Sequence, residues 1–93
     1  MNTIDKFNEH VMGTYGRYDV VMEKGNGRTA VDENGREYID FGSGIGTNSL
    51  GYCDEEWAEA VCAQARAIQH TSNYYYTKVQ ADFAAKLAEV TGY

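Results

Sequence analysis

The sequence predicts an α+β chain with an N-terminal helix, a three-stranded antiparallel meander and two further helices. Three observations carry this prediction. Apolar residues recur at helical spacing near both ends of the chain, two glycine-containing turns separate short strands between them, and a glycine-rich loop follows the third strand. Ninety-three residues allow at most one small domain with a modest core.

The first predicted element is a short helix over residues 3–12. Thr3 is a suitable N-cap residue, and Gly13 closes the segment. The apolar residues of one helical face are Ile4, Phe7, Val11 and Met12. A helix of this length is marginal in isolation, so we expect it to dock on other structure.

Three predicted strands follow, at Val20–Lys24, Arg28–Asp32 and Glu37–Phe41. Gly25–Gly27 is the first turn. Asn34-Gly35 is the second, and this dipeptide favours the positive φ values of a two-residue type I′ turn. Three short strands need a covering layer to be stable.

The glycine-rich loop covers residues 41–51 and contains four of the ten glycines. A helix is predicted from Asp54 to about Gln69, with acidic residues at its positive end. A polar and aromatic linker, His70–Thr77, leads to a last helix at Val79–Val90 that ends at Gly92. Each of these elements presents an apolar face, and their order gives no obvious way to close one core.

Composition excludes several classes of partner. The net charge is −6 and no basic cluster exceeds two residues, which argues against nucleic acid and anionic membranes. No apolar run approaches the length of a membrane span. The N-terminus has no apolar signal core, so a cytoplasmic protein is expected. Cys53 and Cys62 lack metal or redox spacing.

No chemical motif in the residues stands out on its own. The glycines at 42, 44 and 46 follow a strand, but Thr47 stands where the dinucleotide fingerprint has its third glycine, so a crossover loop is favoured over a phosphate site. His10 and His70 lie too far apart to predict a metal site. The sequence identifies no general base positioned beside any of the serines.

Eight tyrosines in 93 residues are many, and several of them lie outside regular structure. A buried tyrosine requires a partner for its hydroxyl. Packing at an interface and contact with a ligand both remain open for these side chains.

Taken together, the segments resemble the N-terminal part of the class III (ω-amino) pyridoxal-phosphate-dependent aminotransferases, and most of all their acetylornithine branch. The resemblance lies in runs that span nearly the whole chain in order: Thr14–Arg17, Glu23–Gly27, Val31–Phe41, Ser43–Gly51 and His70–Asn73. Two places depart from the family pattern. Gly51-Tyr52-Cys53-Asp54-Glu55 stands where Gly-His-x-His-Pro is common, and Lys78-Val79 replaces Glu-Pro.

The resemblance implies the start of a fold-type I α/β transferase. Residues 1–76 would belong to the small domain, and residues 77–93 to the first helix of the large cofactor domain. Pyridoxal 5′-phosphate would be the cofactor of the full-length enzyme. Its Schiff-base lysine, its phosphate-binding run and the carboxylate-gripping arginine are expected outside this chain. We therefore expect a truncated piece that binds no cofactor and is inactive alone, with no catalytic residue of its own.

The resemblance also implies roles for individual residues. Tyr15 matches a position near the distal end of the substrate, and Ser43, Gly44 and Ile45 would line the substrate channel. Relatives that use free ornithine can have tyrosine at position 45, so an apolar Ile45 suits an acylated side chain. The segment 71–76 resembles a part that meets the partner subunit, so a homodimer is expected.

The function implied by the resemblance is transfer of an amino group from N-acetylornithine to 2-oxoglutarate. The products would be N-acetylglutamate semialdehyde and glutamate, in cytoplasmic arginine biosynthesis. Ornithine, succinylornithine and 4-aminobutyrate remain alternative substrates. A non-enzymatic module that associates with itself through apolar faces, and a small nucleotide-binding domain, are the alternatives from other classes.

Overall fold

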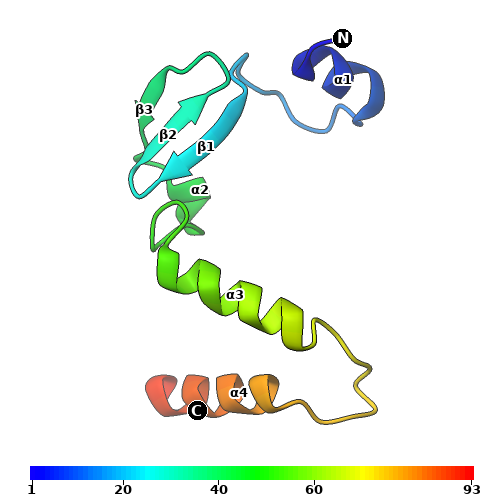
Figure 1. Cartoon of the computed structure of the whole chain (residues 1–93), viewed down its shortest axis with the longest axis vertical. Helices are drawn as coiled ribbons and strands as arrows, with labels where there is room; N and C mark the ends of the chain where they lie inside the picture. Colours follow the sequence, from blue (N-terminus) through cyan, green and yellow to red (C-terminus); the bar gives the residue numbers. More distant parts are fainter. The chain divides into compact units, whose positions relative to one another are not determined.

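The computed structural model describes all residues from Met1 to Tyr93 and contains every predicted helix and strand, with one unpredicted short helix, α2, in the glycine-rich loop (Figure 1). In chain order they are α1 (Thr3–His10), β1 (Met22–Asn26), β2 (Thr29–Asp32), β3 (Glu37–Ile39), α2 (Ser43–Gly46), α3 (Glu55–Ala67) and α4 (Lys78–Thr91). The chain divides into two compact units, Met1–Glu59 and Ala60–Tyr93. The predicted combination of helices with an antiparallel meander is confirmed.

The three strands form one antiparallel sheet in the order β1-β2-β3. Asn26 lies opposite Thr29, so the first turn is Gly27-Arg28. The prediction of a turn at Gly25–Gly27 is wrong, because the turn begins two residues later than predicted. Gly25 instead pairs with Ala30 inside the sheet. The register shifts between Met22 and Lys24, which marks a bulge in β1.

The second hairpin is present, but its turn is not of the predicted type. Gly35 has a φ of +84°, whereas Asn34 is not among the residues with positive φ that a type I′ turn needs at both central positions. The Gly35 N–H donates to the Asp32 carbonyl at 3.0 Å, and Val31 lies opposite Glu37. The loop is therefore longer than two residues and has its left-handed residue at its end. β3 ends at Ile39, two residues before the predicted limit.

The helix termini follow local capping chemistry. Asn2, rather than Thr3, is the N-cap of α1, because its side chain accepts from the Asp5 N–H while Asp5 bonds back to the Asn2 N–H. Asp54 accepts from the Trp57 N–H at 3.0 Å at the start of α3. α4 ends at Gly92 in the left-handed conformation (φ 78°), as predicted.

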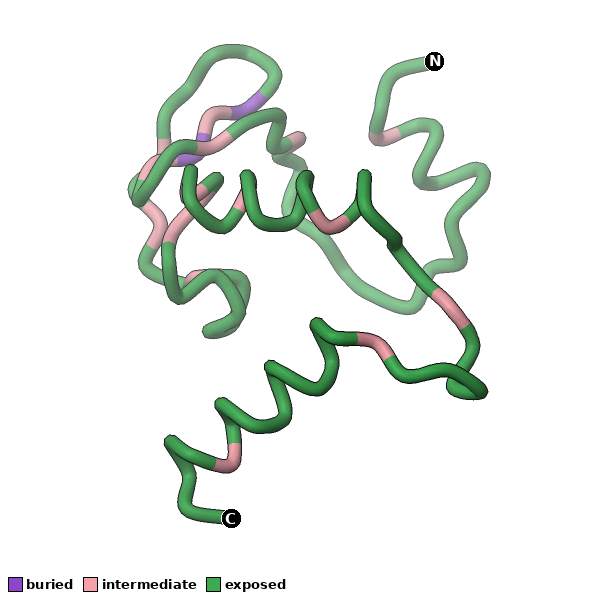
Figure 2. The backbone as a smooth tube through the Cα atoms, turned by 60° about the horizontal axis from the view of Figure 1, so that its bottom comes forward, coloured by how far each residue is buried: buried purple, intermediate pink, exposed green.

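Burial is confined to the sheet, as the tube in Figure 2 shows. Ala30 is the one buried apolar residue and Asp32 the one buried polar residue, both on β2, while no helix contains a buried residue. The predicted apolar faces are therefore present and uncovered. On α3 and α4 their large exposed members are Trp57, Val61, Val79, Phe83, Leu87 and Val90.

Candidate functional site

The glycine-rich loop contains a left-handed turn, α2. Ser43, Gly44, Ile45 and Gly46 have φ values of 52°, 60°, 62° and 82°. Positive φ is easy for glycine but costly for other L-residues, and a β-branched residue such as Ile45 is a clear outlier there. Strained backbone of this kind persists only where its surroundings hold it, and it concentrates at functional sites.

The Asp40 carboxylate, directly after β3, holds the start of the turn. Its Oδ1 accepts the backbone N–H of Gly42 at 2.7 Å and that of Ser43 at 2.9 Å. These charge-assisted bonds fix the two residues through which the chain enters the left-handed conformation. The sheet therefore determines where the turn begins.

Bonds within the loop complete the turn. The Asn48 N–H donates to the Ser43 carbonyl at 2.8 Å, and the Thr47 hydroxyl donates to the Gly44 carbonyl at 3.0 Å. A Cβ on Gly44 would lie 2.8 Å from the Thr47 Oγ1, so position 44 requires glycine for space as well as for its φ of +60°.

The loop returns to the same sheet at Tyr52. Tyr52 and Gly27 form a two-way backbone bridge, with N–H···O distances of 2.7 and 2.9 Å. The Tyr52 ring lies against β1, where a Cβ on Gly25 would stand only 2.6 Å from the Tyr52 Cγ. Position 25 therefore requires glycine, because any side chain there would collide with the Tyr52 ring.

Asp40 and Tyr52 also interact electrostatically. The N–H groups of Ser43 and Gly42 lower the pKa of Asp40, and the Tyr52 hydroxyl adds to this effect. In turn, the bond to the Asp40 carboxylate raises the pKa of the Tyr52 phenol. Both shifts favour a charged carboxylate beside a neutral phenol.

A pocket of about 270 Å³ lies on the C-terminal side of the turn. Residues 47–54 and Trp57 line it, so it mixes hydroxyl and amide groups with an indole. It is the size of a small ligand site at most.

The predicted site residues fall into two groups. Ser43, Gly44 and Ile45 are brought together in the turn, and Ile45 projects fully into solvent, 99% exposed. Tyr15 lines a separate pocket of about 500 Å³ between α1 and the connector, which is the segment 11–21 that leads from α1 to β1. Ser43, Gly44 and Ile45 are not among the lining residues of this pocket. There the Arg17 guanidinium lies over the Phe7 ring at 4.9 Å and over the Tyr15 ring at 5.9 Å.

Sequence reasoning missed Asp40 and Tyr52. The signal for Asp40 is the order Asp-Phe-Gly at a strand end, because an aspartate two residues before a glycine often bonds forward to the backbone. Tyr52 gives no such local signal, since its partners Gly25 and Gly27 lie far away in sequence.

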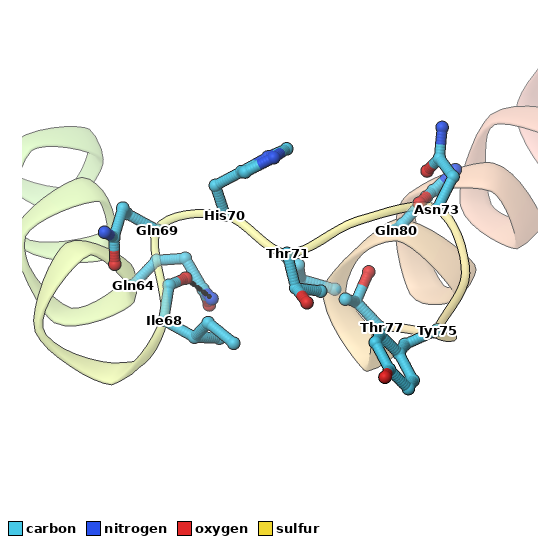
Figure 3. Close-up of a pocket in the computed structure, with 10 residues that line it drawn as sticks. Gln64, Ile68, Gln69, His70, Thr71, Asn73, Tyr75, Thr77 and Gln80 are labelled. Carbon is cyan, nitrogen blue, oxygen red and sulfur yellow. Dashed lines mark hydrogen bonds between the residues drawn. The ribbon is translucent and has the colours of Figure 1, made fainter.

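The segment between α3 and α4 lines a pocket of about 200 Å³ (Figure 3). The Gln64 Nε2 donates to the Ile68 carbonyl at 2.9 Å, the bond dashed in the figure. Ser72 organises the turn that follows, because its Oγ accepts from the Tyr74 N–H and its carbonyl from the Tyr75 N–H. Tyr74 and Tyr76 are left almost wholly exposed.

None of the four lysines lies in an enclosed setting. Lys78 and Lys86 form exposed ion pairs with Asp82 and Glu89 at 2.6 and 3.1 Å. Lys6 is exposed on α1, and Lys24 is exposed at an open surface depression of the sheet. No group of histidine, cysteine and acidic side chains is placed to hold a metal ion. No helix has the length and apolar character that a membrane span requires.

Comparison with known proteins places this geometry in context. The family described as Aminotransferase class-III matches residues 12–93. The acetylornithine aminotransferase of Methanosarcina mazei is 46% identical over 91 residues, which are 98% of this chain and 23% of that protein. The chain thus spans about a quarter of the length of the curated relatives it matches.

Two solved structures share the fold. The ornithine aminotransferase of Toxoplasma gondii superposes with a TM-score of 0.91 at 31% identity, covering 97% of this chain and 21% of that one. The acetylornithine aminotransferase of Elizabethkingia anophelis gives a TM-score of 0.92 at 26% identity, covering 97% and 24%. This arrangement of elements therefore occurs both in a protein named ornithine aminotransferase and in one named acetylornithine aminotransferase.

Proposed function

The chain belongs to the class-III aminotransferases, and from this premise we propose that it is the substrate-facing N-terminal segment of an acetylornithine aminotransferase. The reaction would transfer an amino group from N-acetylornithine to 2-oxoglutarate, yielding N-acetylglutamate semialdehyde and glutamate. The observation that carries the proposal is the 46% identity to the Methanosarcina mazei enzyme across 98% of the chain.

The left-handed turn supports the choice of an acylated substrate. Ile45 is presented outward on a backbone that bonds to Asp40 and to its own loop, so its apolar side chain is available to a ligand. An acetylated ω-amino group has lost its charge, and its methyl group gains from an apolar contact. A free ω-ammonium group beside Ile45 would be left without a partner, which is costly.

The other predicted residues are assigned supporting roles in the same channel. We propose that Ser43 and Gly44 form its wall beside Ile45, and that Tyr15 contacts the distal end of the substrate from the connector. The backbone of the turn is held in place for this role by the bonds that it makes with Asp40, Thr47 and Asn48.

Class-III aminotransferases use pyridoxal 5′-phosphate, which supplies an electron sink for chemistry at the carbon bearing the amino group. The lysines of this chain do not fit the cofactor. A lysine that holds it needs an enclosed site and a lowered pKa, and all four are on open surface. We therefore propose that no residue of this chain binds the cofactor covalently, and we expect the 93 residues alone to transfer no amino group.

Ornithine is the second candidate substrate. The 31% identity and TM-score of 0.91 to the Toxoplasma gondii ornithine aminotransferase favour it. The two candidates differ in one group at the far end of the substrate, charged in ornithine and neutral in its acetylated form. The same assay therefore distinguishes them.

A homodimer in the cytoplasm is the proposed assembly and location. The segment 71–76 supports the dimer, because it presents three consecutive tyrosines to solvent between α3 and α4. Tyrosine is among the residues enriched at protein interfaces.

Two chimeric enzymes test the function. Residues 1–93 replace the matching segment of the Methanosarcina mazei enzyme in one and of the Toxoplasma gondii enzyme in the other. With 2-oxoglutarate as acceptor, we expect the first chimera to prefer N-acetylornithine over ornithine in kcat/KM by about tenfold or more. The second should shift toward N-acetylornithine relative to its unmodified parent. Preference of both chimeras for ornithine would contradict the acetylornithine assignment.

A further inference from the structure

We propose that Asp40 is a positioning residue for substrate binding, which fixes the left-handed turn at Ser43–Gly46 and thereby the direction of Ile45. The inference rests on the proposed function, because it concerns the same site. Asp40 touches no substrate in this proposal and acts only through the backbone of the turn.

The hydrogen bonds of Asp40 carry the argument. One carboxylate oxygen accepts both N–H groups at the entry of the turn, at 2.7 Å from Gly42 and 2.9 Å from Ser43. Ser43 has already reached a φ of 52°, so the bonds lie at the step where the backbone changes hand. Without them, Ser43 and Ile45 would gain by returning to negative φ.

The surroundings of Asp40 keep this carboxylate charged and in place. Tyr52 lies beside it and is itself fixed by its backbone bridge to Gly27 and by the close approach of its ring to Gly25. The Tyr52 hydroxyl also helps to lower the pKa of the Asp40 carboxyl, after the backbone N–H groups of Ser43 and Gly42.

Asp32 offers a matched control within the same sheet. Its Oδ1 also accepts two backbone N–H groups, those of Asn34 and Arg36, at 2.9 and 3.0 Å, and its Oδ2 accepts a tyrosine hydroxyl. The two aspartates share their chemistry, but the loop that Asp32 holds contains no predicted site residue. If the role of Asp40 were purely structural, alanine at position 40 and alanine at position 32 would have equivalent effects on substrate binding.

The test uses the Methanosarcina mazei chimera with Asp40→Ala, Asp40→Asn and Asp32→Ala. Asp40→Ala removes both hydrogen bonds at the entry of the turn, and we expect it to raise KM for N-acetylornithine about tenfold, with kcat changed by less than about threefold. KM for ornithine, which lacks the acetyl group, should change less. Asparagine keeps an acceptor oxygen, so Asp40→Asn should recover most of the affinity.

Hydrogen exchange at residues 42–48 provides an independent readout. Exchange should be faster in Asp40→Ala than in the parent chimera and unchanged in Asp32→Ala. A KM for N-acetylornithine equal in Asp40→Ala and Asp32→Ala would overturn the positioning role. A parent chimera without activity on either substrate would overturn the proposed function instead. In that case, equal exchange at 42–48 in Asp40→Ala and the parent overturns the positioning role, and faster exchange supports the hold of Asp40 on the turn.

Discussion

Tyr38 donates its hydroxyl to the Oδ2 of Asp32 at 3.0 Å, across the hairpin that joins β2 to β3. The other oxygen of the same carboxylate accepts two backbone N–H groups of the turn. Asp32 is 7% exposed and has three partners, so this buried charge is fully bonded. A single side chain thus holds both the turn and the strand that follows it.

Acid should weaken both loops held by aspartates. The backbone bond from Arg36 is the largest cause that lowers the pKa of Asp32, opposed by burial and supported by the Tyr38 hydroxyl; for Asp40 the Ser43 and Gly42 bonds dominate. A lowered folded-state pKa means that the charged form stabilises the fold above the ordinary value of 3.8, and that this stabilisation is lost as pH falls through the folded-state value.

Titration of the ¹³C-labelled carboxyls of Asp32 and Asp40 should therefore give a pKa below 3.8 for each of them. The substitutions Asp32→Asn and Asp40→Asn identify the two resonances. If Asp32 and Asp40 instead titrate at 3.8 or above, the hydrogen bonds of both turns are absent in solution.

The substitution Gly25→Ala should push Tyr52, where the loop returns to the sheet, away from β1. The alanine Cβ would meet the Tyr52 Cγ at 2.6 Å, and overpacking of this kind typically costs about 1–3 kcal/mol. Gly13→Ala is the matched control, because nothing lies within 4 Å of its Cβ. Urea denaturation of the Methanosarcina mazei chimera measures both. Equal stabilities for the two variants would mean that the ring of Tyr52 does not rest on β1.

Glycine at position 45 should stabilise the chain and weaken substrate discrimination. Ile45 has φ 62° and ψ 48°, and a left-handed conformation costs a non-glycine residue about 1–2 kcal/mol, which the substitution relieves. The apolar contact with an acetyl group is lost at the same time. Thermal denaturation and the ratio of kcat/KM for N-acetylornithine and ornithine check the two effects.

The same change at Ile39 is the control for that experiment. Ile39 lies in β3 and is not among the residues with positive φ, so Ile39→Gly should destabilise rather than stabilise. A loss of stability at both positions would show that the backbone at 45 is not strained.

Removal of the exposed tyrosines between α3 and α4 should weaken the proposed dimer. Tyr74 is 93% and Tyr76 106% exposed in the chain alone, and buried aromatic residues often dominate interfaces. The double substitution to serine should shift the chimera toward monomer in sedimentation velocity at micromolar concentration. Tyr18→Ser is the control, since Tyr18 is equally exposed at 93% but lies outside this segment. A dimer that persists in the double variant would place the interface elsewhere.

Sequence patterns predicted α1, α3, α4, the three strands and their order, because local spacing and capping determine them. α3 begins after Asp54 and α4 ends at Gly92, both at positions that capping chemistry indicates. The errors lie where a side chain competes with a backbone preference. Asn34-Gly35 favours a type I′ turn in isolation, but the Asp32 carboxylate binds the Asn34 and Arg36 N–H groups and selects a longer loop.

The site was less accessible to prediction for two physical reasons. The left-handed turn contradicts the intrinsic preference of Ile45, so no propensity could indicate it. The requirement for glycine at position 25 comes from the ring of Tyr52, which is distant in sequence. The roles of Tyr15, Ser43, Gly44 and Ile45 came from resemblance to a family and stay predictions.

The hand of the turn at Ser43–Gly46 has a chemical consequence. For an amino acid of the D series, φ 62° and ψ 48° are the relaxed values of an ordinary helix of its own hand. D-alanine at position 45 would therefore fit this backbone without strain, while L-alanine would not. A chain of 93 residues is within reach of synthesis by peptide ligation, so the mirror-image residue can be introduced as a probe of one torsion angle.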